Sequence, residues 1–382
     1  MRQNALVSRR PKISRDVINL DPHQFLNMVG GQPDTSFQWK TIGKGKYAKR
    51  RLIGRPNNPM RKLHKLFEEY LEAGIKAVEQ DCKEISTMPS ATGCVKESNP
   101  LKNAKKHIKG KFLYITDIKN AYPSIDLERL AMLIVYMKKY DEYKDYFSLR
   151  LLGTGEAVIE ILCDDQLYQP MLSFLQVYCA GLYGKGLAVG APLSPRFMNL
   201  YCEVYLDESL RRLCRKHDAT YTRFVDDIVI SRKSADPLDS VSTYINRALP
   251  EQFRKDVRSY ISRAGLSVNH QKSKVLSRRI GTVFVTKIGL RVNPEDEDGE
   301  AILVFPQKKR RKLHGAITSY IREVEDRPEE VSGLVAEFLY YFKTVKVKTK
   351  TDLKTFQLCK EFEAEWAKWD HNKRPWLRII KR

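Results

Sequence analysis

The sequence predicts an α+β fold, in which an antiparallel sheet is combined with several amphipathic helices. Apolar residues recur at helical spacing from Met60 to Val78 and again over 196–216. Short runs rich in β-branched and aromatic residues, at 111–118 and 221–232, have the composition of strands. After Pro306 the chain becomes basic and helical in composition, so we expect a helical C-terminal part.

The chain is long enough and basic enough to act on a polyanionic partner. It has 382 residues, of which 42% are hydrophobic, so it can form a large core in two or three subdomains. Lys and Arg total 68 against 46 Asp and Glu, and the excess is spread along the chain. We therefore expect a nucleic-acid partner. The simpler alternatives are a basic soluble protein or one that binds anionic lipid.

Several other classes are disfavoured by composition. The seven cysteines are scattered, with no Cys-x-x-Cys pair, which argues against a structural zinc site or a disulfide framework. The first residues are polar and basic, and no apolar run approaches the ~18 residues of a membrane span. We expect a cytoplasmic protein without a membrane partner.

The strand predicted at 111–118 places a carboxylate where an active site commonly lies. Gly110 precedes this strand and the turn-forming residues of NAYPS follow it, so the strand ends near Asp117. From 127 to 180 the composition is mostly helical. Two further short strands are predicted at 281–286 and 288–293.

A second pair of acids is predicted at the tip of a hairpin. In YTRFVDDIVISR (221–232), Asp226 and Asp227 lie between two apolar strands. Alone, such a pair is more often a solvated turn. Between apolar strands, however, buried acids are costly unless a metal neutralises them. Together with Asp117 they could hold the two Mg²⁺ ions of a phosphoryl-transfer site.

These segments, in this order, resemble the reverse transcriptase domain, and most closely its retron-type and related bacterial defence-associated members. The resemblance covers about 49–293 and rests on TDIKNAYPSI (116–125), GLAVGAPLSP (186–195) and FVDD (224–227). It implies a right-hand polymerase with an antiparallel palm sheet, interleaved fingers and a helical thumb. The corresponding parts would be an N-terminal extension (1–45), fingers and palm (46–295), and a helical thumb or RNA-binding region (296–382).

The resemblance assigns roles to the acids and to an aromatic residue close to them. Asp117, Asp226 and Asp227 would bind two Mg²⁺ ions, with Mn²⁺ as an alternative, and Ile118 is included in the metal set. Tyr122 would block a ribose 2′-hydroxyl, which implies deoxynucleotide substrates.

Further substrate contacts are implied on both sides of Asp117. KRRLIGRP (49–56) resembles a fingers block in which Arg51, assisted by Lys49, would contact the triphosphate. Gly190 and Ser194 match a block that lies under the incoming nucleotide, although Ala188 and Val189 replace its usual Pro and Gln.

GLSVNHQKSK (265–274) resembles the block that follows the paired acids, with Asn269 and Lys272 at its matching positions. Lys272 could protonate the leaving pyrophosphate as a general acid. The alternative is a surface lysine of a basic protein.

RNA contacts are implied by three further segments. NAKKH (103–107) matches an Asn-Ala-x-x-His element of retron enzymes, through Asn103 and His107, and FVTKIGLRVN (284–293) partly matches a Val-Thr-Gly element. The alternative for NAKKH is a capped turn and an ordinary surface histidine. The basic run KKRRK is either an RNA or duplex contact or a solvated face, and its candidate contacts are Lys308, Lys309, Arg310 and Arg311.

The predicted function is RNA-directed DNA synthesis from dNTPs. The resemblance further implies a noncoding RNA as template and primer, a cDNA product, an anti-phage role and an effector protein from the same locus as a candidate partner. Alternatives are a defence-associated polymerase that makes template-independent or repetitive DNA, and a noncatalytic RNA-binding subunit. Tyr122 argues against an RNA-dependent RNA polymerase.

Overall fold

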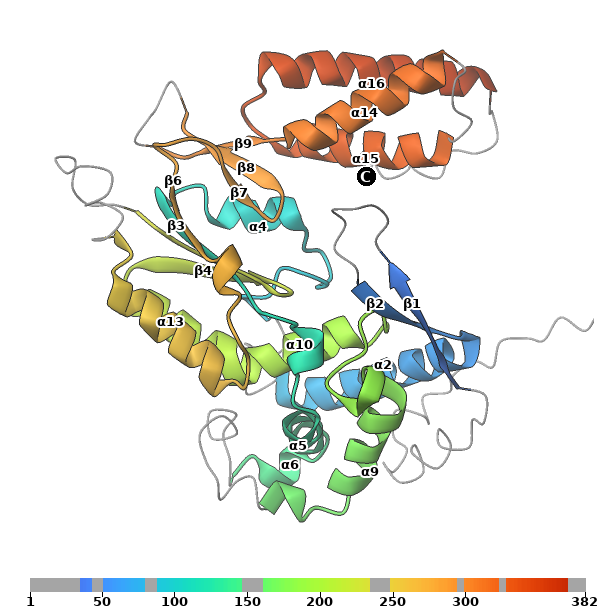
Figure 1. Ribbon diagram of the computed structural model, residues 1–382, viewed down its shortest axis with the longest axis vertical. Helices are drawn as coiled ribbons and strands as arrows, with labels where there is room; N and C mark the ends of the chain where they lie inside the picture. Colours follow the sequence, from blue (N-terminus) through green and yellow to red (C-terminus); the bar gives the residue numbers. More distant parts are fainter. Residues whose placement is uncertain are drawn as a thin grey trace, which may run out of the picture. The chain divides into compact units, whose positions relative to one another are not determined.

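The computed structural model describes residues 35–42, 51–79, 88–145, 161–233, 248–293, 299–322 and 328–369, and all structural statements concern these residues. Helices and antiparallel strands are mixed along the chain (Figure 1), which confirms the expected α+β class. The chain divides into two compact units, and each is assembled from separate stretches of sequence.

The first unit is mainly helical and comprises residues 1–94, 117–213 and 254–271. It begins with an antiparallel hairpin of two strands, β1 (Phe37–Ile42) and β2 (Arg51–Pro56). Its helices, two of which (α11 and α13) cross the unit boundary, are α2 (Asn58–Glu79), α5 (Leu127–Lys138), α6 (Tyr140–Tyr143), α9 (Tyr168–Phe174), α10 (Ser194–Cys202), α11 (Glu208–Lys216) and α13 (Glu251–Arg263).

Polar side chains cap the N-termini of α2 and α5 in this unit. The Oδ1 atom of Asn57 accepts a hydrogen bond from the Met60 amide at the start of α2. At the start of α5, the carboxylate of Asp126 accepts from the amides of Glu128 and Arg129. These bonds satisfy amides that have no partner inside their own helix. The two helices contact each other through their apolar faces.

The second unit contains two antiparallel sheets and a helical bundle. The four-stranded sheet has the order β4 (Ala219–Phe224), β5 (Asp227–Arg232), β3 (Phe112–Asp117) and β6 (Lys274–Ser277). The three-stranded sheet has the order β7 (Val283–Val285), β8 (Ile288–Arg291) and β9 (Ile302–Val304). The helices are α4 (Pro100–Lys106), α14 (Gln307–Ile321), α15 (Pro328–Thr344) and α16 (Lys350–Trp369), and the last three form the orange and red bundle of Figure 1.

One hydrophobic core joins the parts of the second unit. Leu101 of α4, Val229 of β5, Leu290 of β8 and Phe338 of α15 belong to the same buried cluster. Each is almost completely inaccessible to solvent. The sheet that carries the paired acids is therefore packed into the same core as the three-helix bundle.

The elements expected from the sequence occur close to their predicted positions. The helix predicted over Met60–Val78 is α2, the strand at 111–118 is β3, and the hairpin at 221–232 is β4 and β5. The single helix expected over 196–216 is instead α10 and α11 joined by a π-helical turn, Glu203–Asp207. No helix in the described part of the chain is both long enough and apolar enough to cross a membrane.

Candidate active site

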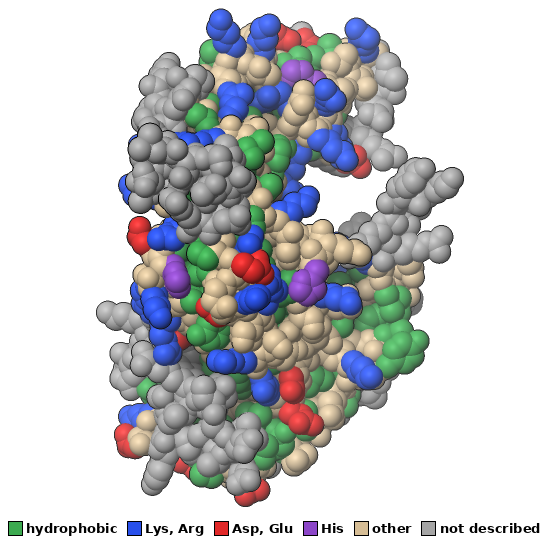
Figure 2. Space-filling model, turned by 60° about the vertical axis from the view of Figure 1, so that its left-hand side comes forward, with side chains coloured by type: hydrophobic (Ala, Val, Ile, Leu, Met, Phe, Trp, Pro, Cys, Tyr) green, Lys and Arg blue, Asp and Glu red, His purple; other side chains and the backbone are tan. Residues whose placement is uncertain are grey.

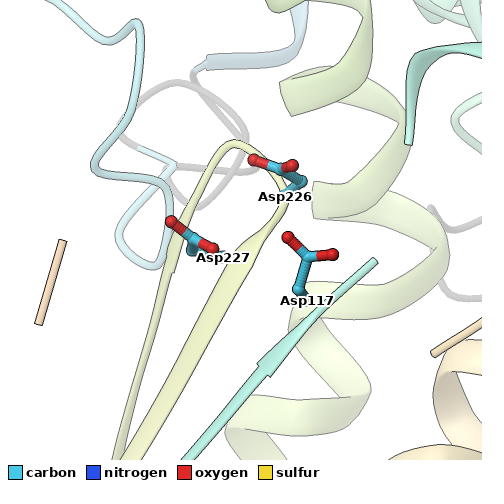
Figure 3. A group of neighbouring side chains, drawn as sticks. All are labelled: Asp117, Asp226 and Asp227. Atoms are coloured by element: carbon cyan, nitrogen blue, oxygen red, sulfur yellow. The ribbon is translucent and has the colours of Figure 1, made fainter. Parts of the chain in front are cut away.

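Asp117, Asp226 and Asp227 come together at one end of the four-stranded sheet. Asp117 is the last residue of β3, and Asp227 is the first residue of β5, which lies next to β3 in the sheet. Asp226 occupies the turn between β4 and β5. One carboxylate oxygen from each residue lies within 4.8 Å of the others, and Figure 3 shows the three groups gathered where β3 ends beside the hairpin tip. The sequence placed these acids on a strand end and a hairpin tip, and the structure brings them together.

The carboxylate of Asp117 is fixed by Asn269. The side-chain amide of Asn269 donates to Asp117 Oδ1 at 3.1 Å, and the Asn269 backbone amide donates to the Asp117 carbonyl at 2.8 Å. A β-bridge between Ile118 and Val268 continues this pairing by one residue. Asn269, predicted as a substrate contact, is thus a direct partner of the buried acid.

The turn that carries Asp226 has an unusual backbone. It is a two-residue connection, because Phe224 pairs with Asp227, and its first residue, Val225, has φ of +59°. A positive φ is rare for a β-branched residue and marks local strain. The guanidinium of Arg223 donates to the Val225 carbonyl at 3.0 Å from a completely buried position.

Arg223 is a site residue that the sequence motifs do not include. Its signal is a lone cation inside a predicted strand, three residues before Asp226. A buried guanidinium needs hydrogen-bond acceptors, and the Val225 carbonyl in the hairpin turn is one of them.

The side chain of His107 also links the two strands of the hairpin, β4 and β5. Its imidazole is completely buried, and its two ring nitrogens lie 2.7 Å from the hydroxyls of Ser231 on β5 and Thr222 on β4. Burial, and next the charge of Lys106, lower the pKa of His107 to about 3. The ring is therefore neutral near pH 7, and one hydroxyl donates to it while the other accepts from it.

Asn103, the other predicted RNA contact of NAKKH, is equally inaccessible. It is completely buried, and its side-chain amide donates to the Thr286 hydroxyl at 3.3 Å in the turn between β7 and β8. Thr286 and Lys287 both have positive φ values. Asn103 and His107 are completely buried, and through these hydrogen bonds they join α4 to the two sheets. Their contact with RNA stays a prediction.

Tyr122, the expected ribose gate, begins a short 3-10 turn five residues after Asp117 and is partly buried. Its carbonyl accepts a hydrogen bond from the Leu187 amide at 2.8 Å. Gly186 packs directly on Pro123, because a Cβ atom on it would lie 2.3 Å from the Pro123 carbonyl oxygen. The segments predicted to contain the gate and the nucleotide platform are thus in direct contact.

Gly190 and Ser194 hold this platform in place. Gly190 has φ of +100°, and a Cβ atom on it would lie 2.5 Å from the Ile53 side chain. The neighbouring Val189 carbonyl accepts from the Gly54 amide of β2 at 2.9 Å. Ser194 is buried and donates to the Ala188 carbonyl at 2.6 Å. Its hydroxyl is therefore used within the chain.

Two of the three cations expected to contact the nucleotide are exposed to solvent. Arg51 is exposed at the start of β2, and Lys272 is exposed in the short helix His270–Lys272 that follows Asn269. Lys49 lies outside the described residues.

The basic run on α14 has only some of its charges available to an external partner. Lys308 and Arg311 are exposed. Lys309 pairs with Glu337, and Arg310 pairs with the completely buried Asp352. Arg310 therefore has a structural partner that the sequence did not reveal. Figure 2 shows Lys and Arg side chains over the visible face of this helical bundle and elsewhere on the described surface.

The three acids suit a divalent metal ion. Carboxylate oxygens are the donors preferred by hard cations, and a buried cluster of acids is costly without a counter-charge. Asp117 is only 5% exposed, while Asp226 and Asp227 are partly buried and face it. The cluster could therefore bind a divalent cation.

Comparison with known proteins gives consistent results. The family model described as "Reverse transcriptase (RNA-dependent DNA polymerase)" matches residues 42–315. Retron Mx65 reverse transcriptase of Myxococcus xanthus is 26% identical over 65% of this chain and 50% of its own length. Retron Ec86 reverse transcriptase of Escherichia coli is 21% identical over 64% of this chain and 70% of its own length. The chain thus spans about half the length of the Mx65 protein.

Among solved structures, apo telomerase from Candida tropicalis is similar over 91% of this chain and 61% of its own length, with a TM-score of 0.45 and 14% identity. The sequence matches confirm the resemblance to retron-type enzymes that the motifs indicated.

Proposed function

Because the chain belongs to the reverse transcriptase (RNA-dependent DNA polymerase) family, we propose that it is an RNA-directed DNA polymerase that adds deoxynucleotides to a primer end. The observation that carries this proposal is the cluster of Asp117, Asp226 and Asp227, with Tyr122 five residues after Asp117 along the chain. A noncoding RNA encoded nearby would be the template, and an anti-phage role with an effector protein is the proposed setting.

The proposed metal-binding residues are the three acids, with the Ile118 carbonyl as an additional ligand. Two bound Mg²⁺ ions, or Mn²⁺, would activate the primer 3′-hydroxyl and stabilise the leaving pyrophosphate. Asn269 has the role of orienting Asp117, since it bonds both the side chain and the backbone of that residue. Arg223 holds the Val225 carbonyl and so fixes the turn from which Asp226 extends.

Other residues would position and select the nucleotide. Arg51, with Lys49, would bind the triphosphate, for which a planar guanidinium is well suited. Tyr122 would exclude a ribose 2′-hydroxyl by contact with its ring. Lys272 would protonate the leaving pyrophosphate. Gly190 and Ser194 would act by shaping the platform under the nucleotide.

The direct test compares the wild-type chain with Asp226→Asn on a primed RNA template. We expect Asp226→Asn to abolish nucleotide incorporation and to retain nucleic-acid binding, because it removes a metal ligand and leaves the phosphate contacts intact. Asp141→Asn is a matched control, since the side chain of Asp141 is 85% exposed in an ion pair on α6. Undiminished incorporation by Asp226→Asn would show that the site assignment is wrong. Binding without incorporation by the wild type would favour a noncatalytic RNA-binding subunit.

A second candidate function is template-independent or repetitive DNA synthesis. It is favoured by Ala188 and Val189, which replace the usual Pro and Gln of the nucleotide platform. Sequencing the products made on two RNA templates of different sequence separates the two functions. Products that follow the template support the first, and identical products from both templates support the second.

A further inference from the structure

A small loop lies next to the residues that are proposed to position the nucleotide. It spans residues 181–186, between the bridge partners Ala180 and Leu187. Two backbone hydrogen bonds close it, from Gly181 to Gly186 at 3.0 Å and from Gly184 to Gly181 at 3.1 Å. Gly186 has no room for a side chain against Pro123. The loop is therefore held in one shape by its own bonds and by its packing.

Tyr183, in this loop, combines a highly exposed aromatic ring with a strained backbone. The residue is 88% exposed, more than any other large hydrophobic residue in the described part of the chain. Its backbone has φ of 67° and ψ of 22°, a left-handed conformation in which a side chain is disfavoured. The residue thus contributes little to the fold while it strains the backbone. Such an outlier indicates a role outside the fold.

Backbone hydrogen bonds connect the end of the loop to residues of the proposed nucleotide site. The Leu187 amide at its end bonds the carbonyl of Tyr122, and two residues later the Val189 carbonyl bonds the Gly54 amide of β2. All these residues belong to the first unit. Lys185, an exposed cation, lies two residues after Tyr183. An exposed ring and a nearby positive charge are the combination that binds a base and its phosphate.

We propose that Tyr183 is a stacking platform for an unpaired base of the template strand, with Lys185 contacting the adjoining phosphate. This inference rests on the proposed function. A template ahead of the polymerisation site is single-stranded, so its bases have a free face for an aromatic ring. Bases of the primer–template duplex are already stacked on both sides. Stacking is tolerant of sequence, which suits a strand that advances by one nucleotide at each addition.

The test measures binding of the full chain to two primer–template duplexes by fluorescence anisotropy. One duplex carries a short single-stranded template overhang, and the other is blunt. Tyr183→Ala should weaken binding to the overhang substrate by about tenfold, a change of about 1.4 kcal/mol, and leave binding to the blunt duplex unchanged. Tyr183→Phe keeps the ring and should bind as the wild type does. Alanine and tyrosine both carry a Cβ atom, so the backbone strain is the same in each.

Val177→Ala is the matched control, because Val177 is 64% exposed on the same unit and should not affect either substrate. Equal weakening on both duplexes, or no weakening on either, would overturn the stacking assignment. A second probe, 2-aminopurine fluorescence, should be quenched in a Tyr183-dependent manner at the first unpaired template position. Quenching only at the primer terminus would assign the ring to the other strand and refute the proposal.

These outcomes are separable from a failure of the proposed function. If the wild type neither binds nor extends a primed RNA, the proposed polymerase activity is wrong. If the wild type extends the primer and Tyr183→Ala binds the overhang equally well, only the template-base site is wrong.

Discussion

Replacement of His107 by phenylalanine should lower the free energy of unfolding, and the hydrogen bonds of the His107 ring set the size of the loss. The ring volume is nearly retained, so the main loss is of two hydrogen bonds, each 2.7 Å long, to the hydroxyls of Thr222 and Ser231. Each buried hydroxyl left without a partner costs about 1–3 kcal/mol, so the loss of both bonds in His107→Phe should cost about 2–6 kcal/mol. This is a large share of a typical stability of about 5–15 kcal/mol. Urea unfolding followed by circular dichroism measures the loss.

His64→Phe provides a matched comparison. His64 is also completely buried, but only one ring nitrogen is bonded, to the Tyr178 carbonyl at 2.8 Å. Its replacement should cost roughly half as much, and it should not alter the rate of primer extension by the folded fraction. His107→Phe should lower that rate, because His107 bridges β4 and β5, the two strands of the hairpin that presents Asp226 and Asp227.

A compensated variant tests the physical cause. With Thr222→Val and Ser231→Ala added to His107→Phe, no buried hydroxyl lacks a partner, so most of the lost stability should return. The reasoning is refuted if His107→Phe costs no more than His64→Phe, or if the triple variant is no more stable than His107→Phe alone.

Three further outcomes are expected. The lowered pKa of His107 means that below its ordinary value of 6.5 the unfolded chain binds a proton that the folded chain excludes. The stability difference between wild type and His107→Phe should therefore shrink by about 1.4 kcal/mol per pH unit from about pH 6.5 toward pH 3, as pH-dependent urea melts would show. Gly190→Ala should cost about 1–3 kcal/mol in the same melts and raise the KM for dNTP, because its Cβ atom would meet the side chain and backbone of β2. Arg310→Met should cost about 3 kcal/mol by leaving the buried Asp352 without its ion pair, whereas Arg311→Met should weaken RNA binding in a filter assay without changing the melting temperature.

The acids could be predicted from the sequence because their local patterns are strong. Asp117 ends a short run of buried strand residues, and Asp226 and Asp227 lie between two runs with strand composition, as the tip of a hairpin does. Each pattern depends on a few neighbouring residues, and the order of the motifs along the chain then joins the two segments into one site.

The supporting residues could not be placed in this way, because their partners are distant in sequence. NAKKH is polar apart from Ala104 and has the composition of an exposed helix, yet His107 is buried against strands that lie more than 100 residues later. A weak signal existed in Thr222 and Ser231, two hydroxyl residues among the buried positions of β4 and β5. Similarly, nothing near Arg310 indicated that Asp352 would pair with it.

The left-handed backbone of Val225 has a consequence for efforts to stabilise this protein. A substitution to glycine at that position would relieve the strain of a positive φ in a branched residue. Screens that select heat-resistant variants would therefore favour changes at this turn. The same turn sets the direction of Asp226, so the stabilised variants should include poor catalysts, and thermal selection should be combined with an activity screen whenever residue 225 is varied.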